Sequence, residues 1–124
     1  MISQSETVAR YIFSENHFSR SGGGRVKYVA YLPLNGETSV FRIDTLSPEK
    51  IWEIGNQIGS ISLRRLRSRG DLLVRDVFEE KLEVIEETSN HLLHANITGW
   101  PTEKARIKKL AMNLADKATL LLKP

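Results

Sequence analysis

The apolar side chains of this chain fall into short strand-like runs and two longer helical stripes. The runs RVKYVAYLP and ETSVFRID are rich in β-branched and aromatic residues, which favour strands. Between them stands Asn35-Gly36, the strongest short signal for a tight β-hairpin. We therefore predict a hairpin whose arms are residues 26–32 and 38–43.

A first helix is predicted to begin at Ser47-Pro48. The Ser47 side chain can accept a hydrogen bond from a free amide of the first turn, and Pro48 lacks the amide that would be unpaired there. The apolar positions that follow at helical spacing are Ile51, Ile54 and Ile58. The pattern predicts a helix over residues 48–59.

The C-terminal segment carries the clearest helical stripe in the chain. Its apolar positions are 107, 110, 111, 114, 118, 121 and 122. This spacing predicts a helix near 102–122, with its lysines in water.

The remaining segments give weaker signals. Residues 5–13 fit a capped helix or a strand. Residues 62–70 suggest one or two helical turns ended by Gly70, and 71–80 suggest a short helix. Residues 81–87 alternate like an edge strand.

These elements predict an α+β fold in a single domain, residues 1–124. A small antiparallel sheet, made of the 26–32/38–43 hairpin and an edge strand, would be packed by the helices near 48–59 and 102–122. The 124 residues, 40% hydrophobic and 27% charged, are enough for a core without metal or disulfide support.

Composition narrows the class of protein further. The chain has no cysteine, which excludes disulfides, a cysteine nucleophile and thiolate metal sites. It shows no apolar run long enough for a membrane span and no secretory signal at its start. We expect a cytoplasmic protein with no membrane association, no cofactor and no bound metal.

The charges are arranged in blocks, although the net charge is only +3. The basic block contains Arg64, Arg65, Arg67, Arg69 and Arg75, and an acidic block follows at 76–87. Such an arginine segment can bind nucleic acid or an acidic protein. The other interpretation is that these arginines pair with the 76–87 carboxylates in the same chain or in a dimer mate. A groove at Gly55 and Gly59 is also compatible with a homodimer.

The segment HLLHANITGWP, residues 91–101, is the first candidate for chemistry. Histidine exchanges protons near neutral pH, so His94 suggests acid–base work. The HxxH spacing lacks a third metal ligand nearby. We expect His94 or Asn96 to help bind an anion where Trp100 leads into the last helix. The alternative is that Asn96 fixes the turn and Trp100 anchors the core.

The second candidate surrounds the glycine-rich segment SRSGGGR. Its possible phosphate ligands are His17, Arg20, Arg25 and Lys27. A strand pattern follows the glycines in place of the helix that a phosphate loop requires, so the segment is not a P-loop. The alternative is a solvated loop.

The two candidates would form one site if His17, Arg42 and His94 converged over the hairpin. Arginine binds phosphoryl or ADP-ribosyl oxygens and histidine moves protons, so such a site would be catalytic. This hypothesis requires the rings of His17 and His94 to lie within about 10 Å of each other.

Two classes of function follow. The first is a binding or adaptor module for nucleic acid or an acidic protein, with Arg64, Arg65 and Arg67 and the lysine-bearing C-terminal helix as its contacts. The alternative is a small hydrolase or transferase acting on a phosphate-containing substrate, nucleotide or ADP-ribosyl, through the histidine and arginine site. The runs SPEKIWEIG and HANITGWP resemble those of small bacterial proteins, and this resemblance implies no particular activity.

Overall fold

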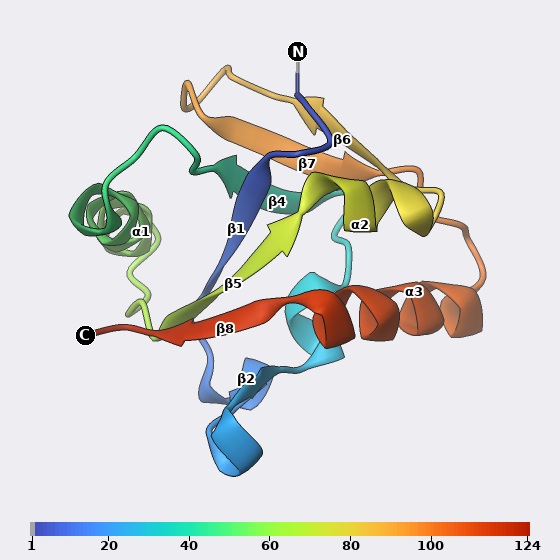
Figure 1. Ribbon diagram of the computed structural model, residues 1–124, viewed down its shortest axis with the longest axis horizontal. Coiled ribbons are helices and arrows are strands. Elements are labelled where there is room, and N and C mark those ends of the chain that lie inside the picture. Colours follow the sequence, from blue (N-terminus) through green and yellow to red (C-terminus); the bar gives the residue numbers. More distant parts are fainter. Residues whose placement is uncertain (1) are drawn as a thin grey trace.

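The computed structural model describes residues 2–124 and is built around a six-stranded antiparallel sheet (Figure 1). The strands are β1 (Thr7–Ile12), β4 (Thr38–Arg42), β5 (Ser68–Leu73), β6 (Glu83–Glu86), β7 (His94–Thr98) and β8 (Thr119–Leu122). Their spatial order is β6-β7-β4-β1-β5-β8. The sheet therefore joins strands from both ends of the chain.

The remaining strands and the helices lie around this sheet. A separate two-stranded ladder pairs β2 (Phe18–Ser19) with β3 (Arg25–Val26). The α-helices are α1 (Pro48–Ile61), α2 (Val74–Glu79) and α3 (Lys104–Lys117). Three short 3-10 helices are η1 (Glu15–His17), η2 (Ser21–Gly23) and η3 (Tyr28–Tyr31). Figure 1 shows α1 on the opposite side of the sheet from α3.

One face of the sheet packs on α3, η3 and α2. Its buried side chains alternate along the strands, as a half-buried sheet requires, and include Val8, Val40, Leu72 and Ile97. Leu114 of α3 and Tyr31 of η3 are completely buried against them. This layer is the larger of the two cores.

The other face packs on α1. Phe41, Tyr11 and Ile54 belong to this smaller core, and the Tyr11 hydroxyl donates a 2.6 Å hydrogen bond to the Ile51 carbonyl of the helix. Gly55 lies against the Tyr11 ring, where an added Cβ would stand 2.7 Å from two ring carbons. The fit of α1 to the sheet is therefore close at this point.

The structure confirms the α+β class and several predicted elements. The predicted 48–59 helix is α1, with Ser47 accepting a hydrogen bond from the Lys50 amide as its cap. The predicted 81–87 edge strand is β6, which lies at one end of the sheet. Asn35 and Gly36 both have positive φ, as a tight two-residue turn needs.

The first arm of the predicted 26–32/38–43 hairpin is wrong. Residues 28–31 form η3, and β4 pairs with β1 and β7 instead. The Asn35-Gly36 turn closes only the Leu34–Glu37 bridge. Aromatic and β-branched residues suit any buried site, so the buried Tyr31 gave the same signal in η3 as it would in a strand.

Two predicted helical segments are also partly wrong. Residues 62–70 contain the start of β5, and Gly70 lies inside that strand. The position is a glycine because an added Cβ there would stand 2.8 Å from the Tyr31 hydroxyl. The predicted 102–122 helix is α3 followed by β8, an edge strand on β5. Three consecutive leucines do not distinguish a strand from a helix.

The Gly55 and Gly59 groove is filled by the chain itself. An added Cβ on Gly59 would stand 2.5 Å from the Arg64 carbonyl oxygen. The groove is thus an internal contact and gives no support to a homodimer. None of the helices within residues 2–124 has the length and apolarity that crossing a membrane demands.

Candidate functional site

A cleft of about 330 Å³ lies between α1 and the open part of the sheet, and we call it the Ser39 cleft. Its lining residues are Ser39, Phe41, Ile54, Gln57, Ile58, Ile61, Ser62, Asn90, His91 and His94. It therefore combines an apolar wall with two histidines and a serine hydroxyl.

Strand geometry places the polar groups of this cleft. Successive residues of a strand alternate between faces, so Ser39 and Phe41 of β4 point toward α1, and so do His94 and Asn96 of β7. Ser39 lies opposite Asn96, and Phe41 lies opposite His94. The adjacent Arg42–Leu93 pair is hydrogen-bonded, so these two pairs are of the closer type that lacks backbone hydrogen bonds.

The His94 ring bridges Ser39 and Glu87. Its Nδ1 lies 2.8 Å from the Glu87 backbone carbonyl oxygen, and its Nε2 lies 2.7 Å from the Ser39 Oγ. A carbonyl oxygen can only accept, so Nδ1 carries the proton and the neutral ring has a free lone pair on Nε2. The Ser39 hydroxyl therefore donates to Nε2, as a nucleophile does to its general base.

The carboxylate of Glu87 supports the same arrangement. Its Oε2 is 3.4 Å from His94 Nδ1, and its Oε1 accepts a 2.5 Å hydrogen bond from the Ser89 hydroxyl. Hydrogen bonds from Ser89, together with His94, lower the pKa of Glu87. Glu87 therefore stays ionised, with its carboxylate on the Nδ1 side of the His94 ring.

His91 presents the complementary polarity in the same cleft. Its Nδ1 accepts a 3.0 Å hydrogen bond from the Leu93 amide, so the neutral ring carries its proton on Nε2. The Phe41 ring lies edge-to-face with His91 at 5.3 Å and also contacts His94 at 5.2 Å. Phe41 thereby fixes the orientation of a hydrogen-bond donor and a hydrogen-bond acceptor at once.

A partly buried arginine stands behind Ser39. The pairing of β1 with β4 ends at the Ala9–Phe41 pair. If it continued in the same register, Tyr11 would lie opposite Ser39, but the two strands separate before that point. Instead, Arg10 Nη1 donates to the Ser39 carbonyl at 2.9 Å and Nε donates to the Ala30 carbonyl at 2.7 Å. The guanidinium thus occupies the gap where the two strands separate.

Arg10 also lines a second, smaller cavity of about 90 Å³, which we call the Arg10 cavity. Its lining residues are Arg10, Tyr11, Phe13, Ser39, Phe41, Ile58 and Arg64. Burial lowers the pKa of Arg10, and the nearby Arg64 lowers it further. The two cavities share Ser39, Phe41 and Ile58, so Ser39 stands at their junction.

Comparison of the chain with known protein families, with curated proteins and with solved structures finds no match.

The predicted catalytic trio does not come together as one site. His94 lies in the Ser39 cleft, but His17 lies in η1 and is not among the residues that line either cavity. Burial lowers the pKa of His17, and the Arg10 cation lowers it further. Arg42 points to the other face of the sheet and pairs with Glu6 at 2.9 Å and Glu86 at 3.0 Å.

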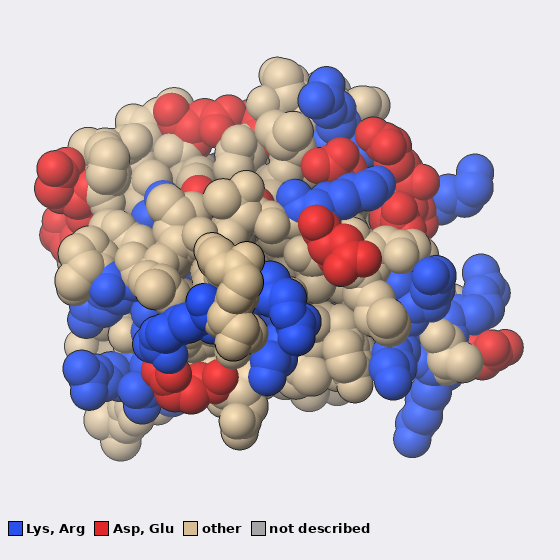
Figure 2. Space-filling view, turned by 60° about the horizontal axis from the view of Figure 1, so that its bottom comes forward, with Lys and Arg blue, Asp and Glu red and all other residues tan. Residues whose placement is uncertain are grey.

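Several predicted ligand-binding arginines do gather, around a hollow of about 200 Å³ that we call the Glu15 cluster. Its basic members are Arg20, Arg65, Arg67 and Lys123. Glu15 lies among them and pairs with Arg20 at 2.6 Å and with Arg67 at 3.3 Å. Figure 2 shows basic side chains over much of the lower part of this view, with acidic ones among them.

These pairings correct the expectation that the arginine block pairs with the 76–87 carboxylates. Arg67 pairs with Glu15, and the buried Arg69 pairs with Asp71 at 2.9 Å. Arg64 is separate from the Glu15 cluster and lines the Arg10 cavity.

The other predicted ligands lie apart from both regions. Arg25 is exposed on β3, and Lys27 precedes η3. Trp100 donates a 3.0 Å hydrogen bond to the Ile97 carbonyl and packs on the larger core, as an anchor would. Asn96 is buried beside Ser39, on the sheet face away from α3, so it does not join Trp100 in an anion site.

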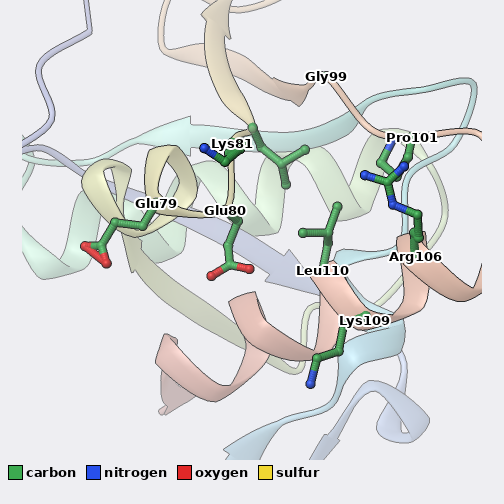
Figure 3. Close-up of a pocket in the computed structure, with 9 residues that line it drawn as sticks. Glu79, Glu80, Lys81, Gly99, Pro101, Arg106, Lys109 and Leu110 are labelled. Carbon is green, nitrogen blue, oxygen red and sulfur yellow. The ribbon is translucent and has the colours of Figure 1, made fainter.

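The start of α3 does border a hollow of about 390 Å³, shown in Figure 3. Arg106 and Lys109 line it together with Glu79 and Glu80. In Figure 3 the Glu80 side chain extends toward α3, where it accepts a 2.7 Å hydrogen bond from Asn113. His91 and His94 line a different cavity, so this hollow carries mixed charge without a histidine.

Sequence reasoning missed three residues of the candidate site: Ser39, Glu87 and Arg10. Ser39 lies in a predicted strand, and nothing in the neighbouring sequence marks a strand serine as a nucleophile. Its partner His94 is 55 positions away along the chain. Within residues 2–124 no three histidine, aspartate or glutamate side chains gather as a metal site would require.

Proposed function

We propose that this protein is a small hydrolase or transferase in which Ser39 is the nucleophile and His94 is its general base. The observation that carries the proposal is the 2.7 Å hydrogen bond between Ser39 Oγ and His94 Nε2 at the wall of the Ser39 cleft. Glu87 orients the imidazole through its backbone carbonyl and its carboxylate. This triad logic recurs on unrelated folds and is recognised by geometry and roles.

The reaction follows from these positions. The Ser39 oxygen forms a bond to the electrophilic carbon or phosphorus of an ester while its proton passes to His94 Nε2. The bond to the leaving alcohol breaks, and His94 returns the proton to that alcohol. Water, or an acceptor alcohol, then attacks the Ser39 ester with His94 as base, which releases the product and restores the Ser39 hydroxyl.

Covalent labelling tests this proposal without a known substrate. A fluorophosphonate probe, followed by peptide mass spectrometry, is expected to label Ser39 in the folded protein. His94→Ala should suppress that labelling, while Ser60→Ala, which removes an exposed serine of α1 outside the cleft, should leave it intact. Labelling that is absent, or that occurs equally in the unfolded chain, would contradict the proposal.

The Glu15 cluster favours a second function, the binding of nucleic acid or an acidic protein partner. Arg20, Arg65, Arg67 and Lys123 converge there from segments far apart in the chain. The affinity for a single-stranded oligonucleotide should fall steeply with salt, and Arg65→Ala with Lys123→Ala should reduce both affinity and salt slope. Lys104→Ala, an exposed change on α3, is the control. Affinity that is independent of salt would contradict this second proposal.

A cytoplasmic location remains part of the proposal, since a chain without cysteine suits a reducing compartment. Fractionation of cells that express the native sequence would test it.

A further inference from the structure

The two adjoining cavities differ in chemistry. The Ser39 cleft has an apolar wall formed by Phe41, Ile54, Ile58 and Ile61, whereas the Arg10 cavity adds two guanidinium groups. Ser39 belongs to the lining of both. A ligand that spans the junction would therefore meet positive charge on one side of Ser39 and apolar surface on the other.

The positive charge of Arg10 is not neutralised by the protein. Among residues 2–124 no carboxylate pairs with its guanidinium, which is held by the carbonyl oxygens of Ala30 and Ser39. Its Nη2 makes no hydrogen bond to any of these residues. A partly buried cation without a counter-charge is costly, and an anionic ligand would relieve that cost.

The second guanidinium is held in place beside the first. Arg64 lies with its Cζ 4.2 Å from the centre of the Phe13 ring, and its Nε donates a 2.9 Å hydrogen bond to the Ser62 hydroxyl. These contacts orient the side chain before any ligand arrives, which lowers the entropy cost of binding. Arg64 also lowers the pKa of Arg10, after burial, so the two cations repel each other in the free protein.

Volume and charge together specify the anion. The Arg10 cavity, about 90 Å³, is several times the roughly 10–15 Å³ that one water molecule needs, which leaves room for one phosphate group. No acidic side chain of the described residues lines either cavity. Two arginines match the two negative charges of a phosphate monoester better than the single charge of a carboxylate.

The apolar side specifies the rest of the ligand. Ile61 lines the Ser39 cleft and is 85% exposed, so it leaves apolar surface open to water at the mouth of the cleft. An apolar or aromatic group lying over Ile58 and Ile61 would bury this surface. The Phe41 ring would form the floor beneath it.

We propose that the Ser39 cleft and the Arg10 cavity together bind phosphate monoesters of apolar or aromatic alcohols, with the phosphate against Arg10 and Arg64. This inference rests on the proposed function for its reaction. Ser39 Oγ forms the bond to phosphorus and passes its proton to His94, the ester bond breaks, and the alcohol leaves with that proton. Water then hydrolyses the phosphoserine and releases inorganic phosphate.

Binding can be tested separately from the reaction by working in a Ser39→Ala background. Arg10 is held by the backbone carbonyl of Ser39, so this change leaves its position intact. The probe is phenyl phosphate, titrated by calorimetry and by amide chemical shifts, with inorganic phosphate and benzoate as comparison ligands. Phenyl phosphate is expected to bind at least about tenfold more tightly than either, because only it fills both cavities with a dianion.

Two neighbouring arginines give a matched pair of variants. Arg64→Ala should weaken phenyl phosphate about tenfold, while Arg65→Ala, an exposed change in the Glu15 cluster, should alter the affinity less than twofold. Arg10→Met should weaken binding as well, and Arg64→Ala keeps the test valid if that variant fails to fold.

Each result decides the inference. Equal affinity for benzoate would overturn the phosphate assignment, and a larger loss in Arg65→Ala than in Arg64→Ala would place the anion in the Glu15 cluster. No saturable binding of phenyl phosphate would overturn the inference altogether. If phenyl phosphate binds as expected but fluorophosphonate leaves Ser39 of the wild-type protein unlabelled, the binding site stands and the nucleophile assignment falls.

Discussion

Two regions of this molecule place arginines beside a hollow, but they balance that charge differently. In the Glu15 cluster, Glu15 pairs with Arg20 and Arg67, so the protein supplies part of its own counter-charge. In the Arg10 cavity, Arg10 donates only to neutral carbonyls. The number of arginines in a sequence segment therefore says less about an anion site than the position of the nearest carboxylate.

The surroundings of the two regions differ as well. The Arg10 cavity adjoins the hydrogen-bonded Ser39–His94 pair, the proposed nucleophile and base. The Glu15 cluster is lined by charged side chains together with Leu66 and Pro124, and no histidine of the described residues lies among them. The first region therefore suits a reaction, and the second suits reversible, salt-sensitive contact.

Removal of the proposed general base, His94, is expected to change the rate of Ser39 labelling more than any other substitution. His94→Ala should lower the rate of Ser39 labelling by about 10²–10⁴-fold, the usual contribution of a general base. His91→Ala should lower it by no more than about tenfold, because His91 makes no hydrogen bond to Ser39 and its Nδ1 accepts from the Leu93 amide instead. Rates are measured by mass spectrometry, with thermal unfolding as the control. If His94→Ala unfolds the protein while labelling of the folded fraction persists, His94 is structural.

The close packing of α1 against the sheet, which forms one wall of the Ser39 cleft, can be tested at Gly55. Gly55→Ala should destabilise the protein by about 1–2 kcal/mol, because overpacking exceeds the helix-propensity gain of alanine. The new Cβ would stand 2.7 Å from the Tyr11 ring, which cannot move away because its hydroxyl is bonded to Ile51 of the same helix. Asn56→Ala, on the exposed face of α1, is the matched control and should be neutral or stabilising. Urea denaturation measures both, and equal midpoints would contradict the packing argument.

The ion pair of Arg42 with Glu6 tests whether Arg42 contributes to stability and not to the candidate site. A side-chain hydrogen bond from Arg42 lowers the pKa of Glu6 below its ordinary value of 4.5. Glu6→Gln should therefore cost roughly 1.5–2 kcal/mol at neutral pH, the lower end of the range for a hydrogen bond to a charged group, because the amide keeps one oxygen that can accept from Arg42.

The sign of the pH dependence follows from that lowered pKa. The contribution of Glu6 is present above its unfolded pKa and disappears as the pH falls through its lower folded pKa. The stability difference between wild type and Glu6→Gln should close in acid, while Ser39 labelling at neutral pH stays unchanged. Loss of Ser39 labelling in Glu6→Gln would indicate that Arg42 takes part in the reaction at Ser39.

The smallest effect is expected in the Glu15 cluster. Arg65→Ala should leave the urea midpoint unchanged, because Arg65 is exposed and makes no ion pair with the described residues. It should reduce the salt slope of oligonucleotide binding by about one, the loss of one phosphate contact. An unchanged slope would remove Arg65 from the interface.

The sequence predicted those parts of the fold that depend on local chemistry. The Ser47-Pro48 start of α1, the Asn35-Gly36 turn and the β6 edge strand each follow from neighbouring residues. The 28–31 segment and β8 were missed because their burial depends on distant partners. Tyr31, for example, is buried against a core that includes α3.

The candidate site shows the same division. His94 was identified from its residue type, since histidine suggests acid–base work wherever it stands. Ser39 could not be identified, because its role depends on the β4–β7 register that places it diagonally across from His94. Arg10 was missed for a similar reason: its position depends on the separation of β1 from β4.

The tautomer of His94 decides whether Ser39 can be the nucleophile, and it is read from the ¹⁵N shifts of the imidazole at about pH 8.5, well above the ordinary histidine pKa of about 6.5. A protonated Nδ1 and an unprotonated Nε2 are expected, with the Nε2 shift changing in Ser39→Ala. That result means Ser39 donates its proton to His94. A proton on Nε2 would make Ser39 the acceptor of this hydrogen bond and would contradict its role as the nucleophile.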